Sequence, residues 1–209
     1  MTAPAAMTYD SLVQDIGNYA ERRDQAFLDQ IPRFIMLAEN RIASECRGLG
    51  FKKYANFTLN SNVIDKPSRW RETVSLNYVV AGEINYAYER SYEYCRVYAP
   101  DPTVTGTPVY YANYDYEHLF IVPTPAASYT AELAYYERPE PLSSTKQTNW
   151  TTQYAPQLLL YACLLETAPW LKNDQRITTW QGMYNTARDD LANESNRRMS
   201  DNANARNSE

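Results

Sequence analysis

Histidine and cysteine, on which much nucleophilic and metal chemistry depends, are sparse in this sequence. There is one histidine, His118, and there are three cysteines, Cys46, Cys95 and Cys163, which form no C-x-x-C pair. This spacing supplies no recognisable metal site and predicts buried, reduced thiols. His118 stands at the start of an expected strand, which favours a structural role in a turn, and no serine lies in a G-x-S-x-G motif. We therefore expect no nucleophilic active site.

Carboxylates near the expected strands are the remaining candidates for chemistry, namely Asp115, Glu117, Glu132 and Glu137. A pair of carboxylates can serve as the acid and base of a glycosidase. However, any acidic, tyrosine-rich β unit brings such pairs together by chance. The 6 glycines form neither a G-x-G-x-x-G motif nor a Walker loop, so no nucleotide cofactor is expected. The sequence thus predicts a protein that is not an enzyme and has no cofactor and no metal.

The 209 residues carry a formal net charge of −5 and a pI near 5.1. Affinity for nucleic-acid phosphates comes from clustered Lys and Arg, so this charge argues against a protein whose main work is to wrap nucleic acid. No stretch approaches the roughly 18 consecutive apolar residues of a membrane span, and residues 1–7 lack the basic and apolar regions of a signal peptide. We expect a soluble protein with no membrane partner.

Tyrosine is the one anomaly of the composition, with 19 residues against 5 phenylalanines. Tyr joins a large apolar body to a hydroxyl, which suits a protein that forms interfaces. Alternatively, the tyrosines fill two-sided strands in a small β unit. A third interpretation is a glycan-binding module, in which exposed Tyr and Trp rings stack on sugars.

Two helices are expected in the first fifty residues, because apolar residues recur at helical spacing at Leu12, Val13, Ile16, Tyr19 and Ala20, and again at Ile31, Phe34, Ile35, Ala38 and Ile42. Thr8 or Asp10 can cap the first helix. Asp29 can cap the second, in which Pro32 occupies a tolerated first-turn position.

Alternating apolar and polar residues predict strands after residue 51, around Phe57 and Leu59 and around Val74, Leu76 and Tyr78. Residues 109–114, 119–122 and 129–136 are expected to form an antiparallel meander. Residues 84–98 are ambiguous, because their charge pairs favour a short helix whereas their tyrosines also suit a strand. Of the two, we favour the helix.

Helical spacing returns at residue 153 and is expected to end at Pro169. A last helix, capped by Asn173 or Asp174, carries apolar residues at 177, 180, 184, 187 and 191. Residues 193–209 hold Met199 as their one large apolar residue, so we expect disorder there unless a partner orders them. Arg197, Arg198, Met199 and Arg206 could bind such a partner by coupled folding.

The expected fold class is α+β, because helices at both ends need mutual partners for their apolar stripes. Residues 1–50 and 146–195 form an antiparallel helical bundle in this prediction. A β-rich unit of residues 51–145, with an antiparallel sheet, is inserted between them. Residues 196–209 form an extended, partner-dependent C-terminal tail.

The chain resembles the head-to-tail adaptor, or connector, proteins of tailed bacteriophages. The resemblance rests on five segments that follow the family's order, TYDSL at 8–12, QIPRFIMLAENRI at 30–42, TPVYYANYD at 107–115, QTNW at 147–150 and, most specifically, LLETAPWLKND at 164–174. Together these segments are spread over residues 8–174, which is most of the chain. No single one is a catalytic signature, so the specificity lies in the series.

This resemblance implies a structural virion protein at the head–tail junction, assembled in the host cytoplasm. Its subunits would form a twelvefold homo-oligomeric ring, bound above to the portal protein and below to a tail or nozzle protein. Double-stranded DNA would pass through the lumen during packaging retention and ejection. The net negative charge of the chain fits this passage, because a lumen that does not bind phosphates lets the DNA move. The alternatives are another tail or baseplate component and the glycan-binding module.

The resemblance also assigns interfaces. In such families the C-terminal segment reaches onto the portal, a role that would fall here to Arg197, Arg198, Met199 and Arg206. Cyclic rings need heterologous contacts, in which different faces of neighbouring subunits meet. Residues that could join a subunit or tail contact are Trp170, Leu171, Asn173, Asp174, Arg176, Tyr110 and Tyr111, although capping and core packing would explain the corner at 170–176 equally well.

Overall fold

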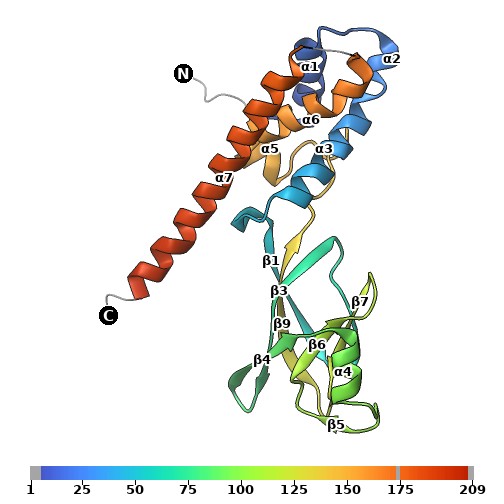
Figure 1. The fold of residues 1–209 in the computed structure, drawn as a ribbon, viewed down its shortest axis with the longest axis vertical. Helices are drawn as coiled ribbons and strands as arrows, with labels where there is room; N and C mark the ends of the chain where they lie inside the picture. The colour runs from blue at the N-terminus through green and yellow to red at the C-terminus, as the bar shows by residue number, and fades with distance from the viewer. Residues whose placement is uncertain (1–5, 173–174, 207–209) are drawn as a thin grey trace. The chain divides into compact units, whose positions relative to one another are not determined.

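Two compact units make up the chain in this computed structural model, which describes residues 6–172 and 175–206. We call Met1–Phe51 together with Arg138–Glu209 the helical unit, and Lys52–Glu137 the sheet unit (Figure 1). Helices and a largely antiparallel sheet are thus segregated along the chain. The fold class is α+β, as predicted.

The helical unit is built around α6. Its elements are α1 (Tyr9–Ala20), α2 (Gln25–Leu28), α3 (Ile31–Glu45), the 3-10 helix η1 (Leu49–Phe51), α5 (Trp150–Tyr154), α6 (Pro156–Leu171) and α7 (Ile177–Arg206). Helix α6 packs against α1, α3, α5 and α7. Its buried residues surround the whole helix, namely Leu158, Leu159, Leu160, Ala162, Cys163, Leu164, Leu165 and Thr167. A helix that is apolar on all sides belongs inside a core, and α6 therefore carries most of this unit's packing.

Helices α1 and α2, but not α3, begin at residues whose side chains satisfy first-turn amides. Thr8 and Ser11 form a capping box, in which the Thr8 hydroxyl accepts from the Ser11 N–H (3.1 Å), which confirms Thr8 as the cap of α1. Asp24 caps the short helix α2 in the same manner. The prediction that Asp29 caps α3 is wrong. Asp29 ends α2 instead, and the N-cap of α3 is Gln30, whose side chain makes no capping hydrogen bond.

Helix α6 passes through Pro169 and ends at Leu171, so the predicted end at Pro169 is wrong. A proline in the last turn removes only the hydrogen bond to Leu165, and the packing of the preceding turns outweighs that loss. The predicted caps of the next helix, Asn173 and Asp174, lie outside the described residues. Helix α7 begins after Arg176, whose carbonyl oxygen accepts from the Trp180 N–H (2.9 Å).

Helix α7 continues to Arg206, where the sequence predicted an irregular, extended tail. The prediction considered only burial, whereas each added helical residue also gains a backbone hydrogen bond once a helix has started. Trp180, Tyr184 and Ser195 are buried and hold the helix on the unit. Glu194 and Arg198 then form an i,i+4 ion pair at 2.5 Å on its surface.

The sheet unit contains β1 (Lys52–Leu59), β2 (Val63–Asp65), β3 (Trp70–Val80), β4 (Glu83–Glu89), α4 (Tyr92–Tyr98), β5 (Thr105–Gly106), β6 (Tyr110–Asn113), β7 (His118–Val122), β8 (Thr124–Pro125) and β9 (Tyr129–Glu137). Seven of the strands form one sheet in the order β1-β9-β3-β4-β6-β7-β2, and β5 pairs with β8. All neighbours in the large sheet are antiparallel except β4 and β6, which are parallel.

The predicted meander is wrong, although its strands exist. Strands β6 and β7 pair antiparallel, but β9 lies between β1 and β3 instead of beside β7. Alternation tells which side chains face the core and not which strand pairs with which. The helix favoured for residues 84–98 is right only for Tyr92–Tyr98, which form α4 with Ser91 as its cap. The residues before it, up to Glu89, form strand β4.

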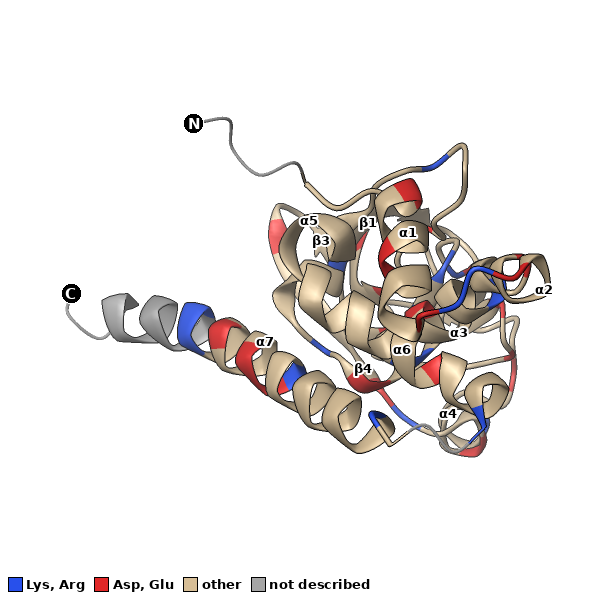
Figure 2. Cartoon of the chain, turned by 90° about the horizontal axis from the view of Figure 1, so that it is seen from above, with Lys and Arg blue, Asp and Glu red and all other residues tan. Residues whose placement is uncertain are grey.

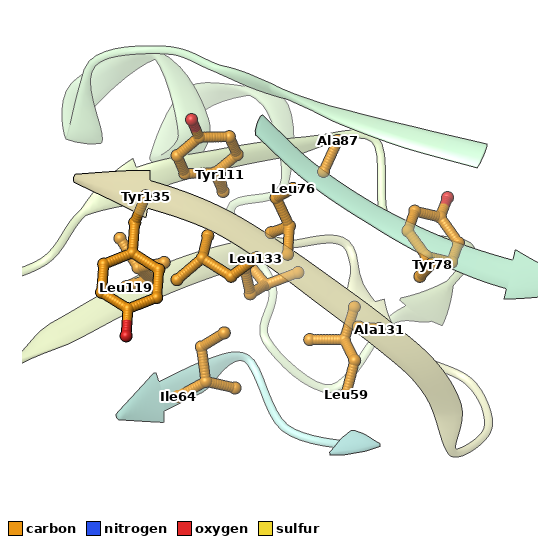
Figure 3. Packing of buried hydrophobic residues seen from close by; sticks show 11 residues of the cluster. Leu59, Ile64, Leu76, Tyr78, Ala87, Tyr111, Leu119, Ala131, Leu133 and Tyr135 are labelled. Atoms are coloured by element: carbon orange, nitrogen blue, oxygen red, sulfur yellow. The ribbon is translucent and has the colours of Figure 1, made fainter. Parts of the chain in front are cut away.

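The core of the sheet unit lies on one face of this sheet (Figure 3). Leucines from four strands meet there, namely Leu59, Leu76, Leu119 and Leu133, with Tyr78, Tyr111 and Tyr135 beside them. The hydroxyl of Tyr78 donates to the Pro108 carbonyl oxygen. A second, smaller cluster of Cys95, Ala112, Phe120 and Val122 forms where α4 packs against β6 and β7. Some of the tyrosines therefore serve packing in the sheet unit, whereas others, among them Tyr54, Tyr86 and Tyr116, are exposed.

Candidate functional site

His118 organises the turn between β6 and β7. Its Nδ1 lies 2.8 Å from the Asp115 carboxylate and its Nε2 lies 3.3 Å from Asp65. The Oδ1 of Asp115 also accepts from the backbone N–H groups of Glu117 and His118, each at 2.7 Å. Across residues 6–172 and 175–206, no group of three or more His, Cys, Asp or Glu side chains could hold a metal ion. The histidine thus sits in a local turn network.

The other predicted carboxylates take part in contacts along the sheet. Glu132 accepts a hydrogen bond from the Asn77 side-chain amide (3.2 Å) on the neighbouring strand. Glu137 forms an ion pair with Arg69 at 2.8 Å. Each contact joins β9 to β3 or to the residues just before it, so both carboxylates act as cross-strand partners.

Glu39 of α3 is a buried carboxyl that the sequence reasoning missed. It accepts hydrogen bonds from the Leu142 N–H (3.2 Å) and from the Asn149 side-chain amide (2.9 Å). Burial raises the pKa of this carboxyl from 4.5 to about 7, against those two hydrogen bonds, which lower it. Its position was the available signal, because it follows Ile35 by four residues and precedes Ile42 by three, on the buried face of α3.

The corner between α6 and α7 is held by Arg176. Its Nη1 donates to the Tyr19 carbonyl oxygen (2.9 Å) and lies 3.2 Å from Glu21, at the end of α1. Its guanidinium also lies over the Trp180 ring, 5.3 Å from the ring centre. Trp170 is 39% exposed at this corner, and Leu171 is half-buried. Of the predicted contact residues described here, Trp170 is exposed, and the side chain of Arg176 is 40% exposed although it already contacts Tyr19, Glu21 and Trp180.

Tyr110 and Tyr111 have opposite surroundings, although they are neighbours on β6. Tyr111 is 3% exposed and belongs to the core, and burial beside Glu89 raises the pKa of its hydroxyl. Tyr110 is half-buried and packs edge-on against Tyr94 and Tyr98 of α4, with ring centres 5.3 and 4.9 Å apart. The sequence could not tell them apart, because both are tyrosines within one strand.

The charged residues of α7 all lie beyond its first eleven residues (Figure 2). Residues 177–187 carry no charge, whereas Arg188, Asp189, Asp190, Glu194, Arg197 and Arg198 follow within eleven positions. Arg197 and Arg198 are exposed, which leaves them accessible to a partner. Met199 and Arg206 belong to α7, but their side chains lie outside what the structure describes.

Three surface cavities lie along this charged part of α7. One of about 410 Å³ is lined by Trp150, Leu191 and Arg198, among others. A second of about 370 Å³ is lined by Tyr154, Leu191 and Arg197, and a third of about 250 Å³ lies between Glu45 and Ser195. These cavities combine aromatic, aliphatic and charged walls, which suits contact with protein side chains.

Sequence comparison assigns the chain to a family. A sequence model described as SU10 adaptor protein matches residues 7–207, which is nearly the whole chain. A search of curated proteins gives no match. No helix within the described residues combines the length and the apolar character that crossing a membrane requires. The match supports the phage adaptor resemblance that the sequence segments carried.

Proposed function

We propose that this chain, which belongs to the SU10 adaptor protein family, is the head-to-tail adaptor of a tailed bacteriophage. In this proposal, twelve copies form a ring between the portal protein and a tail or nozzle protein. The ring encloses a channel for double-stranded DNA during packaging retention and ejection. The family match over residues 7–207 is the observation that carries the proposal.

The helical unit supplies the contact with the portal in this proposal. Its helices from both ends of the chain would act as the predicted antiparallel bundle, and the C-terminal half of α7 would reach the portal. Arg197 and Arg198 are exposed there, beside cavities of about 370 and 410 Å³ that could receive portal side chains. A formal net charge of −5 suits a ring through which DNA must slide.

Protein contact also accounts for the aromatic surface of α4 better than glycan binding does. Sugars stack on open ring faces. Here the guanidinium of Arg90 lies over the rings of Tyr94 and Tyr110, at 5.9 and 5.4 Å from their centres. Tyr98 meets the ring of Tyr110 at 88°. Tyr94 and Tyr98 remain 45% and 46% exposed, but Arg90 lies over a face of Tyr94 and of Tyr110, which leaves fewer open ring faces for a sugar.

Cryo-electron microscopy of native particles, combined with mass spectrometry, tests the proposed position. We expect twelve copies of this chain in a ring between portal and tail. Placement in fibres or a baseplate would support the other tail-component alternative and contradict the adaptor proposal. Absence from the particle would contradict any structural role in the virion.

Truncation of α7 tests the portal contact separately. A chain that ends at Leu191 keeps the buried Trp180 and Tyr184 but loses Arg197 and Arg198. We expect it to fold and to lose binding to the portal protein of the same phage in a pull-down assay. A chain that ends at Arg206 keeps α7 complete and is the matched control. Equal portal binding by the two truncated chains would remove α7 from the proposal.

A further inference from the structure

The seven-stranded sheet has strand edges without a strand partner in the sheet unit, among them the edge of the three-residue strand β2 and the longer edges of β1 and of part of β4. The structure describes every residue of this unit, and within it β1 stands at one end of the sheet order and pairs with β9 alone. Strand β4 pairs with β3 along residues 83–87, but its pairing with β6 begins only at Tyr88. The other edge of residues 83–87 therefore has no strand partner in the unit. Open edges present rows of N–H and C=O groups that can pair with another chain.

The direction of the open backbone groups on β4 follows from its bonds to β6. The Tyr88 N–H donates to the Val109 carbonyl oxygen (3.0 Å) and the Arg90 N–H to that of Tyr111 (2.9 Å). Backbone groups alternate between the two edges of a strand, so those of Ile84 and Tyr86 point to the same edge as those of Tyr88. A tight turn through Ala81 and Gly82, both with positive φ, fixes β4 against β3. This edge is therefore preformed.

Strand direction makes the open edges of β1 and β4 compatible. The order β1-β9-β3-β4 is antiparallel at every step, so β1 and β4 run in opposite directions. A second copy, rotated about an axis roughly along the strands, would bring its β1 beside β4 in antiparallel orientation. Strand direction would then continue to alternate from one copy to the next. Such a contact is heterologous, as ring closure requires.

The side chains of the two edges are also complementary. Strand β1 contains Lys52 and Lys53 and no acidic residue, whereas β4 contains Glu83 and Glu89 and no basic residue. On the sheet face away from the core, Tyr54 is 60% exposed, Ile84 is 64% exposed and Tyr86 is 53% exposed. Pairing two copies of β1, or two copies of β4, would leave their like charges unmatched. The charges therefore favour β1 against β4.

We propose that β1 of one copy pairs antiparallel with residues 83–87 of β4 of the next copy, which makes one continuous sheet around the ring. The inference rests on the ring of the proposed function. The register that pairs all of residues 83–87, the part of β4 with an open edge, places residues 53–57 of β1 opposite them. Tyr54 then lies opposite Tyr86, Asn56 lies opposite Ile84, and Lys53 is a diagonal neighbour of Glu89. In this register, the core-facing side chains of one copy lie on the same face of the sheet as the core-facing side chains of the next copy.

Cysteine cross-linking within the assembled ring tests this pairing. The full-length Asn56→Cys/Ile84→Cys variant is produced together with the portal protein of the same phage and treated with a short bis-maleimide. The natural cysteines are buried and so are shielded from the reagent. We expect a ladder of multimers on a denaturing gel, because each chain carries both halves of the contact. Each single variant should stay monomeric. The Val97→Cys/Ile84→Cys variant, with Val97 81% exposed on α4, should give no ladder.

The remaining outcomes separate the inference from the function on which it rests. Rings without a ladder would overturn the strand pairing and leave the adaptor proposal intact. Dimers from a single variant would also overturn it, because they would show pairing of like edges. Absence of any ring, for the natural chain and the variants alike, would overturn the proposed function together with this inference.

Hydrogen exchange of the unmodified chain provides a second measurement that does not depend on cysteine variants. We expect the amides of Ile84 and Tyr86 to exchange about tenfold or more slowly in the ring than in the separate subunit, because they become hydrogen-bonded. Amides of β1 should be protected to a similar degree. Equal exchange in ring and subunit would overturn the proposal, as would protection that appears only when a tail protein binds.

Discussion

The buried carboxyl of Glu39 predicts that the helical unit becomes less stable as the pH rises. Its pKa is 4.5 in an exposed setting and about 7 in the folded protein. Below pH 4.5 the carboxyl is protonated in both states and carries no penalty. Between these values the unfolded chain releases the proton while the folded chain keeps it, so unfolding becomes more favourable. The stabilisation is lost as the pH rises through about 7.

The size of the effect follows from the same two values. They differ by about 2.5 pH units, and each unit corresponds to about 1.36 kcal/mol, so the full loss at pH 8 is about 3 kcal/mol. The Glu39→Gln variant cannot ionise, and its side-chain oxygen can still accept hydrogen bonds from Leu142 and Asn149. We expect the free energy of unfolding of the variant to exceed that of the natural chain by about 1 kcal/mol or less at pH 5 and by about 3 kcal/mol at pH 8.

Urea unfolding followed by far-UV circular dichroism, at several pH values from 5 to 8, measures this difference. Comparing the two chains at each pH cancels the titration of all other groups. Glu93→Gln, at an exposed position on α4, is the matched control and should follow the natural chain. If Glu39→Gln shows the same pH dependence as the natural chain, burial does not shift this carboxyl and the reasoning fails.

Three further substitutions test local packing and capping. Gly50→Ala should lower the free energy of unfolding by about 2 kcal/mol, because its Cβ would lie 2.0 Å from ring atoms of Trp150, and thermal unfolding followed by tryptophan fluorescence measures this. Gly182→Ala, where nothing lies within 4 Å of the added Cβ, should instead raise stability by about 0.5–1 kcal/mol in the same assay, and a loss there would contradict the open surroundings. Thr8→Ala should lower the free energy of unfolding by about 1 kcal/mol, measured by far-UV melts, because the capping box is lost. Thr8→Ser should keep the capping box and the stability of the natural chain. Equal values for these two variants would refute the capping role.

The helices were largely predictable from the sequence, because helical spacing reports directly which residues face a core. Helix α2 was missed because four residues are too few to show a period, although Asp24 was a usable capping signal. The end of α6 at Leu171 was missed because local rules give Pro169 too much weight against the packing of the preceding turns. The C-terminal half of α7 was missed because burial alone decided that prediction.

The sheet and the candidate interfaces were less predictable. Alternation in β9 places Leu133 and Tyr135 in the core whether β9 pairs with β7 or with β3. The difference between Tyr110 and Tyr111 likewise depends on tertiary placement, because Tyr111 belongs to the sheet core whereas Tyr110 packs against α4. The open edges of β1 and β4 required the sheet order, because no local pattern states which backbone groups lack a partner.

The central position of α6 has a consequence for the order in which the protein folds during synthesis. Helices α1 and α3 leave the ribosome before the sheet unit, whereas α6, against which both pack, is made after it. The core of the helical unit therefore cannot be completed until residues 156–171 have been translated. The sheet unit, which is one continuous segment, can fold earlier. A nascent chain whose residues up to 137 have left the ribosome, but whose residues 156–171 have not, would carry a finished sheet unit and two helices that still lack their central partner.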